Sequence, residues 1–260
     1  MIELKEVLEI PTFSSKEDLM IEFISKFCNE HNLPFFVDDK RNIYVTKGEI
    51  KEGEYYPCVV AHTDTVHFDQ EHLIMSNSKI TINSKSISED KTKLTGWDSI
   101  NQCATGIGGD DKCGVYICLK MLLDMDTLKA AFFVEEETGM WGSKEADVNF
   151  FSNVGYAIQF DAPTINWFSR TLLNTRLWNE SFYFGVKPIL ENYQIDNISD
   201  DPFTDVLQLR KKFDFCVAVF PTGYYNQHSK HEYVIPEETE QCVQMGIEAV
   251  KKLGNIKYLF

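Results

Sequence analysis

Residues Gly106-Ile107-Gly108-Gly109-Asp110-Asp111-Lys112-Cys113-Gly114 place two adjacent acids in a glycine-rich turn, directly before the apolar, helix-patterned run 115–123. Neighbouring carboxylates raise each other's pKa unless a cation or hydrogen bonds lie between them. If Asp110 and Asp111 act in function, they therefore predict a bound cation. The structural alternative is that both acids occupy the solvated first turn of a helix, where the helix dipole favours them.

Short apolar runs that end at polar side chains recur on both sides of this turn. Residues 56–61 lead into His62-Thr63-Asp64, residues 130–134 into Glu135-Glu136-Glu137, residues 155–160 into Asp161, and residues 215–220 into Pro221-Thr222-Gly223. Each run has the length of a buried strand, and the helix-patterned run 115–123 lies between the first two. The alternation predicts an α/β fold of three α/β/α layers with a mixed, largely parallel central sheet. We expect one domain over residues 1–260.

The remaining segments are typical of the same fold class. Ser15 and Asp18 form a capping-box pattern for a helix that ends near Glu30, and 35–45 reads as two strands around a polar turn. A hairpin is expected over 74–87. Pro188 is expected to interrupt a helix that begins near Asn179, and a last helix is expected from Pro236 to Gly254.

Composition excludes some classes of function. The 260 residues are 43% hydrophobic and carry a formal charge of -15, which argues against a nucleic-acid partner because phosphate binding needs a basic face. The seven cysteines form no CxxC pair, and this favours a reducing compartment. Neither a signal peptide nor a run of membrane-spanning length is evident. We therefore expect a soluble, cytoplasmic protein with no membrane partner, and its oligomeric state stays open.

The polar residues at the predicted strand ends have the chemistry of a two-metal site. Borderline metals such as zinc bind neutral imidazole and carboxylate oxygen, and a cluster this acidic would be very costly to bury without cations. The residues are His62, Asp64, Asp110, Asp111, Glu136, Glu137, Asp161 and His228.

Four segments carry a specific resemblance to a known family. They are Ala61-His62-Thr63-Asp64-Thr65, Gly109-Asp110-Asp111-Lys112-Cys113-Gly114, Glu136-Glu137-Thr138-Gly139 and His228-Ser229-Lys230-His231-Glu232. In this order they resemble the four motifs of the tripeptidase T family and, more broadly, those of the co-catalytic dizinc aminopeptidases and carboxypeptidases. The resemblance spans residues 56–235.

The resemblance implies a role for each residue. His62 and Asp161 would bind one zinc ion, Glu137 and His228 would bind the other, and Asp110 would bridge the two. Asp64 would orient the His62 ring, and Asp111 would be a turn residue after an unusual, possibly cis, peptide. Glu136 would be the general base that takes a proton from the water between the metals and passes it to the leaving amine. Thr204-Asp205 resembles a Thr-Asp pair that lies near the family's substrate cleft.

One feature departs from the family. Tripeptidase T carries a lid or dimerisation domain between the residues that match Asp161 and His228, and here that interval is too short for a separate domain of about 100 residues. The expected function is therefore aminopeptidase action on short peptides by a stand-alone domain. A metal-dependent deacylase of small N-acyl compounds and a catalytically silent binding module on the same fold are the alternatives. Among the other histidines, His67 and His72 are expected at the surface, whereas His231 could be exposed or lie behind the ligands.

Overall fold

The computed structural model describes residues 2–201 and 203–260. Its central sheet has six strands in the order β1-β2-β7-β3-β8-β12. Strands β7, β3, β8 and β12 run parallel, while β1 and β2 join antiparallel at one edge. This confirms a mixed, largely parallel sheet. The strands are β1 (Phe35–Val37), β2 (Ile43–Lys47), β3 (Tyr56–His62), β7 (Leu128–Phe133), β8 (Val154–Ala162) and β12 (Cys216–Pro221).

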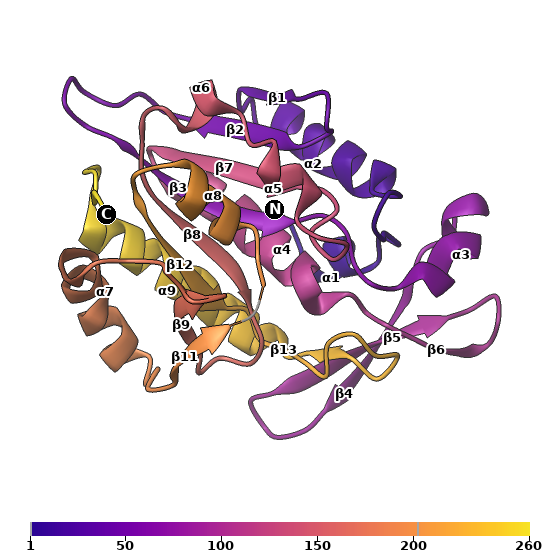
Figure 1. Ribbon diagram of the computed structural model, residues 1–260. Coiled ribbons are helices and arrows are strands. Elements are labelled where there is room, and N and C mark those ends of the chain that lie inside the picture. The colour runs from indigo at the N-terminus through magenta and orange to yellow at the C-terminus, as the bar shows by residue number, and fades with distance from the viewer. Residues whose placement is uncertain (1, 202) are drawn as a thin grey trace.

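Helices cover both faces of this sheet (Figure 1). Helix α4 (Gly109–Asp124) packs on β3, β8 and β7, and it contacts α1 (Leu4–Leu8) and α9 (Pro236–Leu253) on the same side. Helix α8 (Val206–Lys212) packs on β12 and β8, and α5 (Trp141–Lys144) packs on α8. The fold thus has the expected three α/β/α layers, and β3, β7 and β8 are almost wholly buried because they lie in the middle layer.

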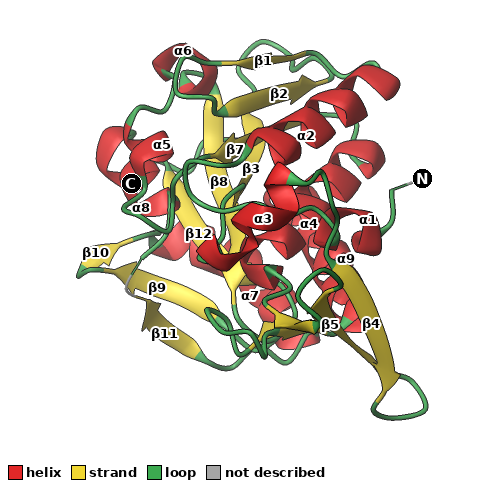
Figure 2. Ribbon diagram, turned by 90° about the vertical axis from the view of Figure 1, so that its right-hand side faces the viewer, coloured by secondary structure: helices red, strands yellow, loops and turns green. Residues whose placement is uncertain are grey.

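Two smaller sheets flank the central one. One has the order β13-β14-β5-β4 with β6 paired to β5, and the other has the order β10-β9-β11. The β4–β5 hairpin extends away from the rest of the molecule (Figure 2). The strands are β4 (Thr81–Ser86), β5 (Thr92–Asp98), β6 (Cys103–Thr105), β9 (Phe168–Leu172), β10 (Thr175–Arg176), β11 (Ile198–Asp201), β13 (Tyr224–Tyr225) and β14 (Tyr233–Val234).

The remaining helices are short or lie at the periphery. They are α2 (Asp18–Glu30), the 3-10 helix η1 (Phe68–Gln70), α3 (Glu71–Met75), α6 (Val148–Phe151) and α7 (Glu180–Asn192). None of the described helices is long and apolar enough to span a bilayer. The interval between Asp161 and His228 builds the β9–β11 sheet, α7, α8, β12 and β13.

Three local expectations were wrong. Ser15 does not cap α2, which begins at Asp18 after Glu17, because the Ser15 side chain instead donates to Glu135. The predicted hairpin lies further along the chain, at residues 81–98, since residues 71–75 are helical. Helix α7 continues through Pro188, whose side chain lies at the surface, where solvent can satisfy the carbonyl that proline leaves unpaired.

Candidate metal centre

Four of the five predicted ligands come from elements that meet at one edge of the central sheet, and the fifth, His228, lies between β13 and β14. His62 ends β3, Asp110 begins α4, Asp161 lies near the end of β8, and Glu137 follows β7. Parallel neighbours end at the same sheet edge, and the register pairs His62 with Phe133 of β7. The strand ends therefore deliver side chains from distant parts of the sequence to one place.

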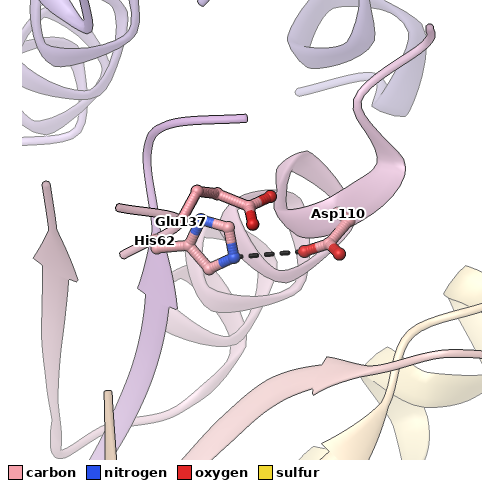
Figure 3. A group of neighbouring side chains, drawn as sticks. All are labelled: His62, Asp110 and Glu137. Carbon is pink, nitrogen blue, oxygen red and sulfur yellow. Dashed lines mark hydrogen bonds and ion pairs between the residues drawn. The ribbon is translucent and has the colours of Figure 1, made fainter. Parts of the chain in front are cut away.

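Asp110 lies between the two histidines. Its Oδ1 is 3.1 Å from His62 Nε2, and its Oδ2 is 3.2 Å from His228 Nε2. The ligand atoms of His62, Asp110 and Glu137 lie within 4.8 Å of one another, and Figure 3 shows the three side chains pointing toward a common point. Asp110 thus presents one oxygen to each histidine, which is the arrangement that a bridging carboxylate needs.

Each histidine has a second carboxylate beside it. His62 Nε2 is 3.4 Å from Asp161 Oδ1, and His228 Nε2 is 3.2 Å from Glu137 Oε2. The structure therefore brings the five predicted ligands into two overlapping groups that share Asp110. The His228 side chain is 53% exposed and the His62 side chain 1%, so the centre opens to the surface on the His228 side.

Asp64 lies behind the centre and is fully buried. Its backbone oxygen is 3.1 Å from His62 Nδ1, and its Oδ1 is 3.3 Å from the same ring nitrogen. The Asp64 carboxylate also accepts hydrogen bonds from the backbone amides of Glu136 and Glu137 and from Ser14 Oγ. It therefore fixes the His62 ring and the segment after β7 together, as acids behind metal-bound histidines commonly do.

Asp111 faces the backbone instead of the open side of the centre. The peptide between Asp110 and Asp111 is cis. Asp111 Oδ2 accepts from the His62 amide and Oδ1 accepts from the Gly114 amide. Its ligand atom lies near those of His62 and Asp161, but both carboxylate oxygens already have backbone donors.

Glu136 lies next to the predicted ligands but is further from His62 than Asp161 is. Its Oε2 is 4.0 Å from His62 Nε2, and its side chain is 8% exposed. Burial raises the pKa of Glu136 well above its ordinary value against the opposing effect of His62, and the carboxylates of Asp161 and Asp205 add to this rise. A carboxylate of this kind binds a proton more readily than one in water, which suits a general base.

Burial and neighbouring charges also shift the pKa values of the predicted ligands. Burial would lower the pKa of His62, but Asp161, Asp110 and Asp64 raise it well above its usual value. Hydrogen bonds to Asp110 and Glu137 raise the pKa of His228 to about 10. Burial would raise the pKa of Asp110, but the two histidines hold it below its ordinary value. The carboxylates and the two histidines of the centre thus interact strongly with one another.

Two observations indicate that this centre could bind a cation. Glu137 Oε1 is buried and has no hydrogen-bond partner among the described residues. Among residues 2–201 and 203–260, no lysine or arginine forms an ion pair with the buried carboxylates of this centre. These carboxylates are Asp64, Asp110, Glu136, Glu137 and Asp161. Imidazole and carboxylate donors arranged in this way suit zinc and related divalent ions.

Three further residues contact the residues of this centre, and the sequence singled out only Thr204. Thr204, which the resemblance places near the substrate cleft, donates from Oγ1 to Asp161 Oδ2, and Gln159 Nε2 donates to the same oxygen. Glu17 is buried, and its Oε1 accepts from the amide of Glu135 next to the proposed base. No sequence pattern near Glu17 indicated its contact, because its partner lies far away in the chain. Gln159 lies two residues before Asp161 on β8, where alternate side chains face the same side of the sheet.

The exposure of the other histidines differs in part from the expectation. His67 is 7% exposed, with its ring against Gly106 and its Nε2 2.9 Å from Glu232, so its assignment to the surface was wrong. His72 is partly exposed and pairs with Asp98. His231 is exposed, which resolves its two alternatives in favour of the surface.

The fold and this geometry can be compared with known proteins. No family model matches the sequence, and no curated protein matches it. Solved structures do match. Aminopeptidase PepT from Bacillus cereus superposes with a TM-score of 0.75 at 11% identity, over 96% of each chain. The chain has the fold of this aminopeptidase.

Two further structures agree with this assignment. A tripeptidase from Staphylococcus aureus has a TM-score of 0.71 at 11% identity, over 95% of this chain and 96% of its own. An aminopeptidase from the archaeon Desulfurococcus kamchatkensis has a TM-score of 0.71 at 13% identity, over 97% and 94%. The aminopeptidase fold is therefore matched by peptidases of bacteria and archaea.

Proposed function

We propose that this protein is a metal-dependent aminopeptidase that removes N-terminal residues from short peptides. The observation that carries the proposal is the position of Asp110, whose two carboxylate oxygens face His62 and His228, with Glu136 beside them. The aminopeptidase fold supports it, because the structural neighbours bear the names of an aminopeptidase and a tripeptidase.

In this proposal, the centre would hold two divalent ions, zinc by preference. His62 and Asp161 would hold one ion, Glu137 and His228 would hold the other, and Asp110 would contribute to both. The unpartnered Glu137 Oε1 and the excess of buried carboxylates support this assignment. When bound, such ions supply an activated water and polarise the scissile carbonyl.

Glu136 is the proposed general base. It takes the proton of the attacking water and passes it to the nitrogen of the scissile bond, which leaves as the amino terminus of the shortened peptide. Its raised pKa and its position near His62 Nε2 support this role. Asp64 holds the Glu136 amide and the His62 ring in place and does not itself exchange a proton with the substrate.

The substrate is proposed to enter from the side on which His228 is exposed. We further propose that the chain acts as one catalytic domain, because the interval between Asp161 and His228 builds part of the central sheet and its covering elements. A cytoplasmic location and a preference for short peptides remain predictions from the sequence.

A peptide library tests the proposal. Di-, tri- and tetrapeptides with free N-termini are incubated with zinc-loaded protein, beside the same peptides with acetylated N-termini, and the products are identified by mass. The proposal expects release of the first residue from free peptides only. Release of the acetyl group without peptide cleavage would favour a deacylase. Bound metal with no reaction on either set would favour a binding module.

A further inference from the structure

Glu232 is a fully buried carboxylate that the proposed reaction does not use. It follows the ligand His228 by four residues and directly precedes β14. Strand β14 pairs with β5, so the backbone around Glu232 is anchored to a sheet that is separate from the central one. A carboxylate buried so completely needs partners for both oxygens.

Those partners belong to the glycine-rich turn that carries Asp110. Glu232 Oε2 accepts from the Gly108 amide at 2.8 Å and lies 2.9 Å from His67 Nε2. Glu232 Oε1 accepts from the Asp110 amide at 3.0 Å. Glu232 therefore binds the backbone of the very residue whose side chain lies between His62 and His228.

The glycines of the turn allow this close approach. A Cβ atom on Gly106 would lie 1.9 Å from the His67 ring, and one on Gly109 would lie 2.7 Å from Tyr224 Cβ and 2.8 Å from Val234 Cγ2. Any larger residue would push the turn away from His67 and from β13 and β14. The glycine pattern thus serves packing against Glu232 and its neighbours.

We propose that Glu232 is a positioning residue for the metal centre. It links the segment that carries His228 to the turn that carries Asp110. Glu232 therefore fixes the distance between the Asp110 carboxylate and the His228 ring. This inference rests on the proposed function, since it concerns how the chain holds its metal ligands. Lys112 does not share this task, because its Nζ donates to the carbonyls of Leu8 and Ile107.

The three donors explain why a carboxylate is required. Glu232 faces two backbone amides and one ring nitrogen with its two acceptor oxygens. A glutamine has one acceptor oxygen and one amide group that only donates. If that oxygen keeps the two partners on the His67 side, the new NH2 group faces the Asp110 amide. The turn must then shift, and Asp110 shifts with it.

The matched variants Glu232→Gln and Glu238→Gln test this inference. Glu238 is also a buried glutamate with two side-chain partners, Lys91 and Tyr225, but it contacts no proposed ligand. Zinc affinity is measured by competition with a chromogenic chelator, and the environment of bound cobalt(II) by its visible absorption spectrum. Thermal unfolding of the metal-free proteins reports folding. We expect Glu232→Gln to weaken binding of at least one ion by about 10–100-fold and to change the cobalt spectrum. Glu238→Gln should match the wild type in both.

The outcomes separate this inference from the proposed function. Wild-type zinc affinity and an unchanged cobalt spectrum in folded Glu232→Gln would overturn the positioning role alone. A wild-type protein that binds no divalent ion would overturn both. If Glu232→Gln does not fold, Glu232→Asp replaces it: the shorter carboxylate keeps the charge but cannot reach both amides, so the same loss of metal affinity is expected, and wild-type affinity would again overturn the role.

Discussion

The carboxylate of Asp64 accepts a hydrogen bond from the backbone amide of Glu136, with 3.0 Å between Oδ1 and the amide nitrogen. The same oxygen lies 3.3 Å from His62 Nδ1. The buried Asp64 thus fixes the position of the His62 ring, a proposed metal ligand, and that of the backbone of Glu136, the proposed base. Changes at Asp64 should therefore alter metal binding and catalysis together.

Asp64→Asn tests this link. The new amide group would face backbone N–H donors of Glu136 or Glu137, so the ring and the segment after β7 should both lose their fixed positions. We expect zinc affinity to fall by about 10–100-fold and peptide cleavage at saturating zinc to fall as well. Ser14→Ala is the control, because it removes only one hydrogen bond to Asp64 and leaves the others in place. Equal effects of the two changes would contradict the role assigned to Asp64.

Gly114 tests the packing of α4 behind the centre. An added Cβ would lie 2.2 Å from the carbonyl oxygen of Phe160 and 2.3 Å from Asp111 Oδ1. We expect Gly114→Ala to destabilise the fold by about 2 kcal/mol, which lowers Tm by about 4–8 °C in a protein of this size.

Gly185→Ala is the matched helical control. A Cβ there would first meet Leu253 Cδ2, at 2.7 Å, which is the flexible end of a side chain. Alanine is favoured over glycine within a helix by up to about 1 kcal/mol, so Tm should stay unchanged or rise. A Gly114→Ala protein as stable as Gly185→Ala would show that α4 does not sit as closely on β8 as the structure has it.

The metal-free protein should lose stability as pH rises. Burial raises the pKa of Glu17 from 4.5 to about 7, with a contribution from Asp64, and burial raises the pKa of Asp205 from 3.8 to about 7. A group whose pKa is higher in the folded state holds its proton longer there, so its stabilisation is present at low pH and is lost between the unfolded and the folded pKa. The window is therefore about pH 4 to 7.

Thermal unfolding of chelator-treated protein checks this sign. One unit of pKa shift corresponds to about 1.4 kcal/mol, so Tm should fall by on the order of 10 °C from pH 5 to pH 8. Asp205→Asn should reduce the fall. Zinc should reverse the trend, because its ligands must be deprotonated to bind. A metal-free Tm that rises steadily over the same range would contradict the buried state of Glu17 and Asp205.

Much of the fold and of the site follows from local sequence. The apolar runs that end at His62 and Asp161 were predicted as strands and are strands, because a buried parallel strand needs a continuous apolar segment. The Pro236 and Gly254 signals bound the last helix correctly. The ligand set came from motif resemblance, and the structure brings its members together at one sheet edge.

Long-range contacts explain what the sequence did not reveal. His67 has no apolar pattern around it, and its burial depends on Glu232, 165 residues later in the chain. Ser15 matched a local capping pattern, yet its hydroxyl donates to Glu135, 120 residues away. Each residue obeys ordinary hydrogen-bond chemistry, but its partner is known only once the strands are placed side by side.

Metal content measured beside activity tests the central claim most directly. Wild-type protein and Glu136→Gln are loaded with zinc, freed of excess ion, analysed for bound metal, and assayed on a short peptide with a free N-terminus. We predict close to two ions per chain in both proteins and a loss of cleavage in the variant of about 100-fold or more. A wild-type protein without bound metal, or a Glu136→Gln protein that cleaves as fast as the wild type, would contradict the account.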